Sequence, residues 1–193
     1  LIEPVRDFFD RFGIKIASIL LLIVATYRLT DIVMGPMANP FYIDMGYSLS
    51  EIGYVVKIVA LIATIIGVFV GGIFIKRLGL YHSLLLGAFL VMVTNLCFSY
   101  ASISDKNLFL LASIVASDSF AAGIVGTVNI TFLTSLVSKK YPGFQYALLT
   151  SLMAFLGKVF GGFSGIFVEN FQLIYGFNYG WMSFYIFTSM LAI

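Results

Sequence analysis

Six apolar segments, separated by short polar links, constrain this sequence of 193 residues more than any other feature. The hydrocarbon core of a bilayer is roughly 30 Å thick and needs about 20 helical residues to cross it. The sequence is 61% hydrophobic and 10% charged, whereas soluble domains carry about 25% charged residues. We therefore expect an all-α integral membrane protein with six transmembrane helices in a lipid bilayer. In order, the segments are 14–38, 50–75, 83–101, 108–137, 144–168 and 181–193.

The ends of the chain suggest a piece of a longer protein. The sequence begins with Leu1 rather than methionine, and the segment 181–193 has only 13 residues. A helix that crosses a bilayer needs about 17–25. We therefore expect residues 1–193 to form one six-helix bundle that is truncated at both ends.

Several functional classes find no support in the sequence. It lacks phosphate-binding, hydrolase and zinc-protease motifs, and it has no basic aromatic groove for nucleic acid. Cys97 and His82 are the only residues of their kinds, and neither has partners spaced as metal ligands. We therefore expect no enzyme activity, no cofactor, no metal and no nucleic-acid partner.

The links carry residues typical of helix ends. Ser48 and Glu51 match a capping box at the start of the second helix, and Gly79 follows the second helix. Gly35-Pro36 and Asn39-Pro40 are expected to end or kink the first helix, since proline breaks the hydrogen-bond ladder. We expect Gly35 and Pro36 to act as a hinge that gates the outer end of this helix.

The basic residues indicate the orientation. With a cytoplasmic N-terminus, the inside segments hold seven lysines and arginines, whereas the outside loops hold only Lys106. Positive residues favour the cytoplasmic side, so both ends of the chain are expected inside. The seven inside residues are Arg6, Arg11, Lys15, Lys76, Arg77, Lys139 and Lys140.

A glycine pattern recurs 90 residues apart, in the second and fifth segments. These two helices would run in opposite directions, as an inverted repeat of three plus three helices requires. Small residues four apart also let helix backbones pack closely, which is an alternative explanation of the pattern. The residues are Gly67, Gly71 and Gly72 in the second segment, and Gly157, Gly161 and Gly162 in the fifth.

Five ionisable residues lie at membrane depth: Arg28, Asp31, Lys57, Asp118 and Lys158. A charge near the bilayer centre costs roughly 2.5–3.5 kcal/mol on insertion scales, and such residues usually face a cavity. Arg28 and Asp31 share a helix face at a spacing of three. The three cations are candidates for binding an anionic solute, and the two carboxylates for proton coupling. As alternatives, the pair stabilises one helix only, and the lysines extend to the interface.

The sequence also resembles one half of a major facilitator superfamily transporter, and most closely the C-terminal half of AmpG-type muropeptide permeases. Phe144 and Lys158 depart from the pattern of the family, where threonine is usual at the first position and arginine can occur at the second. The resemblance rests on the runs Tyr27-Arg28-x-x-Asp31, Pro40-Phe41-Tyr42-x-Asp44-x-Gly46, Glu51-Ile52-x-x-Val55-x-Lys57, Gln145-Tyr146-Ala147-Leu148-Leu149-x-Ser151 and Ser164-Gly165-x-x-Val168-Glu169.

This resemblance implies helices 7–12 of a twelve-helix permease of the bacterial inner membrane, whose partner is an N-terminal six-helix half. Such permeases are proton-driven symporters that import anhydro-muropeptides by alternating access. They serve peptidoglycan recycling and, in some bacteria, β-lactamase induction. Two alternatives stay open: a facilitator half for another solute, such as acetyl-CoA or a sugar, and a degenerate membrane fragment without transport.

Overall fold

The computed structural model describes residues 2–192, and nearly all of them are helical. The expected all-α fold is confirmed, and five stretches are long and apolar enough to cross a membrane. The helices are α1 (Ile2–Thr26), α2 (Leu29–Asp44), α3 (Leu49–Tyr54), the π-helical turn η1 (Val55–Val59), α4 (Ala60–Leu78), α5 (Leu80–Ala101), α6 (Leu108–Leu136), α7 (Pro142–Gly162), α8 (Ser164–Tyr175) and α9 (Phe177–Met190).

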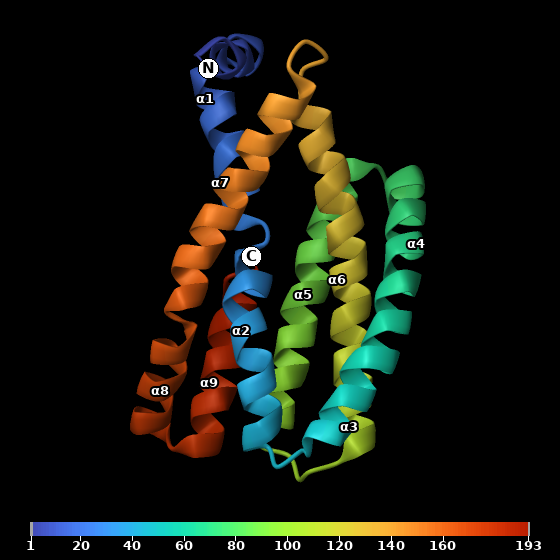
Figure 1. Cartoon of the computed structure of the whole chain (residues 1–193), viewed down its shortest axis with the longest axis vertical. Coiled ribbons are helices and arrows are strands. Elements are labelled where there is room, and N and C mark those ends of the chain that lie inside the picture. The colour runs from blue at the N-terminus through green and yellow to red at the C-terminus, as the bar shows by residue number, and fades with distance from the viewer. Residues whose placement is uncertain (1, 193) are drawn as a thin grey trace.

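The long helices run roughly side by side along the bundle (Figure 1). Helix α6 packs against α4 and α5, α5 also packs against α9, and α7 packs against α1 and α2. One end of the bundle, here called the basic end, carries the start of α1 and the loop between α6 and α7. The loops between α2 and α3 and between α5 and α6 lie at the opposite end (Figure 1).

Helix α1 bends sharply at Gly13, whose backbone has φ 71° and ψ 154°. This conformation suits glycine because residues with a side chain rarely adopt a positive φ. Residues 2–12 therefore form a separate short helical segment that lies across the basic end (Figure 1). Its Pro4 and Phe8 are buried, whereas Arg6 and Asp10 are exposed.

The first membrane segment differs from the sequence prediction. It is interrupted at Tyr27 and Arg28, between α1 and α2. Of the two expected effects of Gly35-Pro36 and Asn39-Pro40, the end of the helix is excluded, because α2 contains both prolines and continues to Asp44, and a kink there stays a prediction. Neither tyrosine nor arginine is a helix breaker, so this interruption depends on tertiary contacts.

The second, third and fourth segments begin and end close to their expected bounds. The capping box of Ser48 and Glu51 is confirmed, and Gly79 follows α4 with φ 81°. The fifth segment is longer than expected and is interrupted at Phe163, between α7 and α8. The sixth begins at Phe177, four residues earlier than expected.

Two apolar cores hold the bundle together. The first lies toward the opposite end and contains aromatic residues of α2, α5 and α9, including Phe41, Phe98 and Tyr185. The second lies toward the basic end and joins residues 2–12 to the rest of α1, to α6 and to α7. Leu29 packs against the first core and Val24 belongs to the second, so the interruption of the first membrane segment lies between the two.

Candidate functional site

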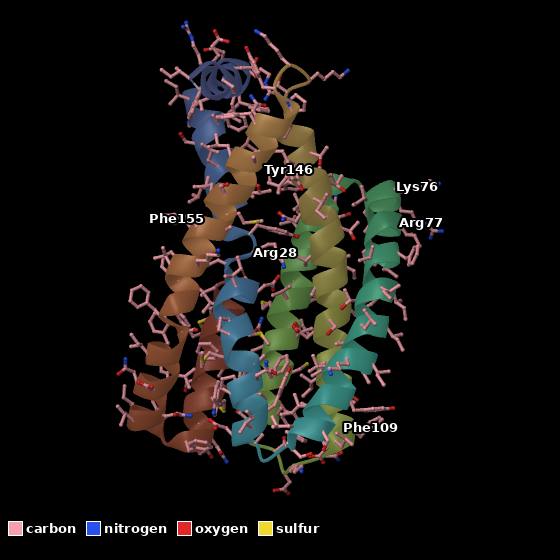
Figure 2. The ribbon with its side chains drawn as sticks, viewed as in Figure 1. Arg28, Lys76, Arg77, Phe109, Tyr146 and Phe155 are labelled. Atoms are coloured by element: carbon pink, nitrogen blue, oxygen red, sulfur yellow. The ribbon has the colours of Figure 1, made fainter. Side chains whose placement is uncertain are left out.

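The interruption at Tyr27 and Arg28, here called the helix break, places a charged pair about midway along the bundle (Figure 2). Arg28 caps α2 with φ −105° and ψ 10°. Its Nε lies 3.5 Å from Oδ2 of Asp31, and the two side chains are 34% and 21% exposed. Both atoms are buried without a hydrogen-bond partner among the described residues. The expected pairing is confirmed, but Nε of Arg28 and Oδ2 of Asp31 can each still form a hydrogen bond with another group.

Contacts with neighbouring helices fix the helix break on both sides. The Tyr27 hydroxyl donates a hydrogen bond to the Leu84 carbonyl of α5 at 3.2 Å. A Cβ on Gly87 of α5 would lie 2.7 Å from this hydroxyl, so glycine leaves room for the tyrosine ring. On the other side, Ile32 packs against Gly157 of α7. The helix break is therefore positioned by α5 and α7.

Within residues 2–192, Asp118 forms no ion pair with a lysine. Instead, the Thr94 hydroxyl of α5 lies 3.2 Å from its Oδ1 and donates a hydrogen bond to it. Asp118 and Asp31 are also near enough to interact through their charges. The structure thus brings Arg28, Asp31 and Asp118 into one region, with two carboxylates and one guanidinium.

The two lysines form no ion pair with these groups within residues 2–192. Lys57 lies on η1 and Lys158 on α7, both side chains are exposed, and neither forms an ion pair within residues 2–192. A π-helical turn inside a membrane segment often marks a functional position. Whether the lysines face the same cavity as Arg28 stays a prediction.

The two glycine motifs each pack against another helix. A Cβ on Gly71 would lie 3.1 Å from the Ile124 backbone of α6, and a Cβ on Gly67 would lie closer still to the Phe120 carbonyl of α6. A Cβ on Gly161 would lie 2.9 Å from the Ile32 carbonyl of α2. The third glycine of each motif does not take part: Gly72, Gly162 and likewise Gly35 have open space where a Cβ would be. The inverted repeat itself stays a prediction.

Among the described residues, no group of three or more His, Cys, Asp and Glu side chains is placed to hold a metal ion. The groups near the helix break are the Arg28 guanidinium and the carboxylates of Asp31 and Asp118. A guanidinium at mid-bundle can bind a carboxylate, and carboxylates there can exchange protons.

Comparison with known proteins gives the same family as the motifs. The chain is 32% identical to the anhydromuropeptide permease of Escherichia coli K12, over all of the chain and 37% of that protein. It is also 32% identical to the putative transporter AmpG 4 of Rickettsia conorii, over all of the chain and 44% of that protein. The resemblance to AmpG-type permeases is confirmed. No family model matches the chain.

The AmpG-type relatives are all much longer than the matched region. The putative transporter AmpG 1 of Rickettsia prowazekii, 32% identical over 96% of the chain, is covered over 41% of its length. The chain thus spans about two fifths of the length of the curated relatives it matches, which agrees with one half of such a transporter. These relatives are named as transporters or permeases.

One polar cluster of this AmpG-like chain was not predicted from the sequence. Gln145 belongs to a run that supported the resemblance, but its contacts were not foreseen. It is 2% exposed, donates to the Pro4 carbonyl at 2.7 Å and to Asp7 at 3.1 Å, and accepts from the Ser138 N–H at 2.7 Å and from Arg11 at 3.1 Å. We call this the Gln145 cluster. The sequence signal for this cluster is a glutamine in an otherwise apolar stretch, because a buried amide needs hydrogen-bond partners.

Arg11 completes the cluster. It also donates to the Leu136 carbonyl at 2.9 Å and lies 3.2 Å from Asp7. The cluster therefore joins residues 2–12 to the end of α6 and the beginning of α7. A corresponding connection at the opposite end is the ion pair of Lys106 with Glu51 at 2.9 Å.

Proposed function

We propose that the chain is the C-terminal six-helix half of a proton-driven importer of anhydro-muropeptides. In this proposal it works by alternating access, together with an N-terminal six-helix half. The single observation that carries the proposal is the helix break at mid-bundle, with Arg28 and Asp31 at its edge, in a chain that resembles AmpG-type permeases throughout.

An interrupted membrane helix suits a transport site. Non-helical backbone at membrane depth is tolerated where it is buried in protein or lines a wet cavity. Substrate and ion sites of secondary transporters are typically formed by such discontinuous helices near the bilayer midplane. Tyr27 and Arg28 interrupt the first membrane segment in this way, which supports a role in binding.

The charges favour an anionic solute. Anhydro-muropeptides carry peptide carboxylates, and a guanidinium binds a carboxylate through paired hydrogen bonds. Arg28 Nε already lacks a hydrogen-bond partner within the described chain. Lys57 and Lys158 add two exposed cations. We therefore assign Arg28, Lys57 and Lys158 to substrate binding, and Asp31 or Asp118 to the exchange of protons.

The proposal includes a partner and a membrane. Exposed lysines at membrane depth are costly in lipid, so a second six-helix half that covers Lys57 and Lys158 would stabilise them. The location is the bacterial inner membrane, with the basic end in the cytoplasm. The physiological role is cell-wall recycling, with β-lactamase induction in some bacteria. The protein is proposed to act as a transporter and not as an enzyme.

The test compares solutes and variants in proteoliposomes that hold the chain with or without an N-terminal six-helix half. We expect labelled anhydro-muropeptide to accumulate only with both halves and an inward proton gradient. Arg28→Gln should abolish uptake of the peptide-bearing solute, whereas Arg28→Lys should retain part of it. Lys76→Gln is the matched control, because Lys76 points away from the bundle (Figure 2).

Other outcomes would contradict the proposal. Uptake of acetyl-CoA or a free sugar in place of the muropeptide would indicate a facilitator for another solute. No uptake by the chain, either alone or with an N-terminal half, would indicate a non-transporting fragment. Uptake by the chain alone would contradict the requirement for a second half.

A further inference from the structure

Thr94 holds one hydroxyl proton between two acceptors. Its Oγ1 lies 3.2 Å from Oδ1 of Asp118 and 3.1 Å from the carbonyl oxygen of Val91, one turn earlier in α5. A hydroxyl has a single proton, so it can donate to only one of these acceptors at a time. Thr94 is also buried, which leaves little competition from water. The hydroxyl therefore has two alternative states.

The state of Asp118 decides which acceptor is used. When Asp118 is ionised, it has no proton to donate, and the Thr94 hydroxyl donates to the carboxylate. When Asp118 binds a proton, its O–H can donate to Thr94 Oγ1, and the threonine proton then turns to the Val91 carbonyl. One O–H bond forms on Asp118, and the hydroxyl of Thr94 rotates without losing its own proton.

Other charged and titratable groups face Asp118 from the neighbouring helices. Asp31 and Tyr42 of α2 interact with its charge, as does Tyr185 of α9. Lys57 on η1 and Lys158 on α7 are exposed and do not pair with it. The hydrogen bond from Thr94 is the direct contact that the described residues offer to this carboxylate.

We propose that Thr94 is a positioning residue that sets how readily Asp118 exchanges its proton, by alternating its hydroxyl between the Asp118 carboxylate and the Val91 carbonyl. Its consequence for transport rests on the proposed function. Without the hydroxyl, the ionised carboxylate loses its donor, so Asp118 stays protonated to a higher pH. Hydrogen bonds to charged groups contribute enough that we expect a shift of about one pH unit.

The first measurement is a pH titration of the reconstituted chain by infrared spectroscopy, which follows the C=O stretch of protonated carboxyl groups. Asp118→Asn identifies the band of Asp118. We expect Thr94→Val to raise the midpoint of that band by about one pH unit and Thr94→Ser to restore it. Thr94→Ala also removes the hydroxyl and leaves a smaller side chain. It should raise the midpoint as well, and it replaces the valine variant if that variant does not fold.

Thr64→Val is the matched control, because the Thr64 hydroxyl donates only to the Ala60 carbonyl, at 2.8 Å. An unchanged midpoint in both Thr94→Val and Thr94→Ala would overturn the inference. So would a midpoint that Thr64→Val shifts equally.

The second measurement is the pH dependence of muropeptide uptake with both halves present. If Asp118 couples protons, the uptake profile of Thr94→Val should shift in the same direction as the infrared midpoint. An infrared shift with an unchanged uptake profile would support the role of Thr94 and contradict proton coupling through Asp118. The two measurements therefore distinguish a failure of the inference about Thr94 from a failure of the proposed function.

Discussion

At the scale of single residues, Arg28 and Asp31 are paired loosely enough for either side chain to bind another group. Its closest atoms are 3.5 Å apart and make no hydrogen bond, whereas strong guanidinium–carboxylate pairs are shorter and bidentate. A loosely joined pair at membrane depth costs desolvation without full compensation. This arrangement favours a role in binding over one in helix stability.

Asp31→Asn tests whether this carboxylate carries a proton. Asparagine keeps the size of the side chain but cannot exchange a proton, so we expect muropeptide binding to persist and proton-driven accumulation to be lost. Binding and accumulation are measured separately in the same proteoliposomes. Asp105→Asn, in an exposed loop, should leave both unchanged. Full accumulation by Asp31→Asn would leave only a structural role for the pair.

Gln145→Ala tests the second buried polar feature. The substitution leaves the Ser138 N–H and the Pro4 carbonyl without their partner, and each unsatisfied buried group costs about 1–3 kcal/mol. We expect backbone amides of residues 2–12 to exchange hydrogen roughly ten- to hundredfold faster, as measured by mass spectrometry. Ser151→Ala, at an exposed position of α7, is the control. Unchanged exchange would show that the apolar contacts of Phe8 suffice.

At the scale of helices, the glycines of α7 determine how closely α2 approaches. A Cβ on Gly157 would overlap the side chain of Ile32, with its Cγ2 at 2.8 Å. Ile32 follows Asp31 directly, so a displaced α2 also moves the charged pair.

Gly157→Ala should therefore lower both stability and transport. Overpacking typically costs about 1–3 kcal/mol, which thermal unfolding in detergent would detect together with a reduced uptake rate. Gly162→Ala is the control on the same helix, because nothing lies within 4 Å of its Cβ position. Equal effects of the two substitutions would contradict the assigned contact.

Pro36→Ala tests the proposed hinge. Proline has no N–H, so the Ile32 carbonyl one turn earlier loses its helical partner, and this carbonyl faces Gly161 of α7. Alanine would restore the hydrogen bond and stiffen α2, and we expect slower uptake. Pro142→Ala is the control, since Pro142 begins α7, where an N–H needs no helical partner. Unchanged kinetics would exclude a gating role for Pro36.

The helices themselves were largely predictable, but the interruptions were not. Apolar length predicted six segments, and Ser48, Glu51 and Gly79 marked ends that the structure confirms. The helix break contains neither glycine nor proline and depends on contacts such as that of Tyr27 with Leu84. Such contacts join distant residues, so the local sequence carries no sign of them.

Part of the site was likewise predictable. The cost of a buried charge singled out Arg28, Asp31 and Asp118, which the structure brings together. The hydrogen-bond partner of Asp118 was not predicted, because Thr94 is a neutral residue in an apolar helix. Lys57 and Lys158 were singled out by the same argument, but both are exposed and form no ion pair within residues 2–192.

At the scale of the whole molecule, the two ends of the bundle differ in charge and in how they are held. The basic end contains the Gln145 cluster, whereas the opposite end contains the pair of Lys106 and Glu51. Positive residues favour the cytoplasmic side. We therefore predict that the basic end faces the cytoplasm, and this orientation can be measured directly.

Cysteine labelling in intact cells tests this orientation. In a Cys97→Ser background, we expect Lys106→Cys to react with a membrane-impermeant maleimide from outside. Lys140→Cys, which lies in the loop of the basic end, should react only after the cells are permeabilised. The reverse pattern would contradict a cytoplasmic N-terminus.

The Gln145 cluster also imposes an order on biosynthesis. Pro4 and Gln145 are 141 residues apart, and ribosomes add about 5–20 residues per second. At that speed roughly 7–28 s pass between the synthesis of residues 2–12 and that of the glutamine that binds them. During this interval Arg11 and Asp7, which lie one turn apart and can pair with each other, lack the partners that α6 and α7 later provide. A chaperone or the membrane surface that holds this segment would therefore act early, before the last two membrane segments emerge.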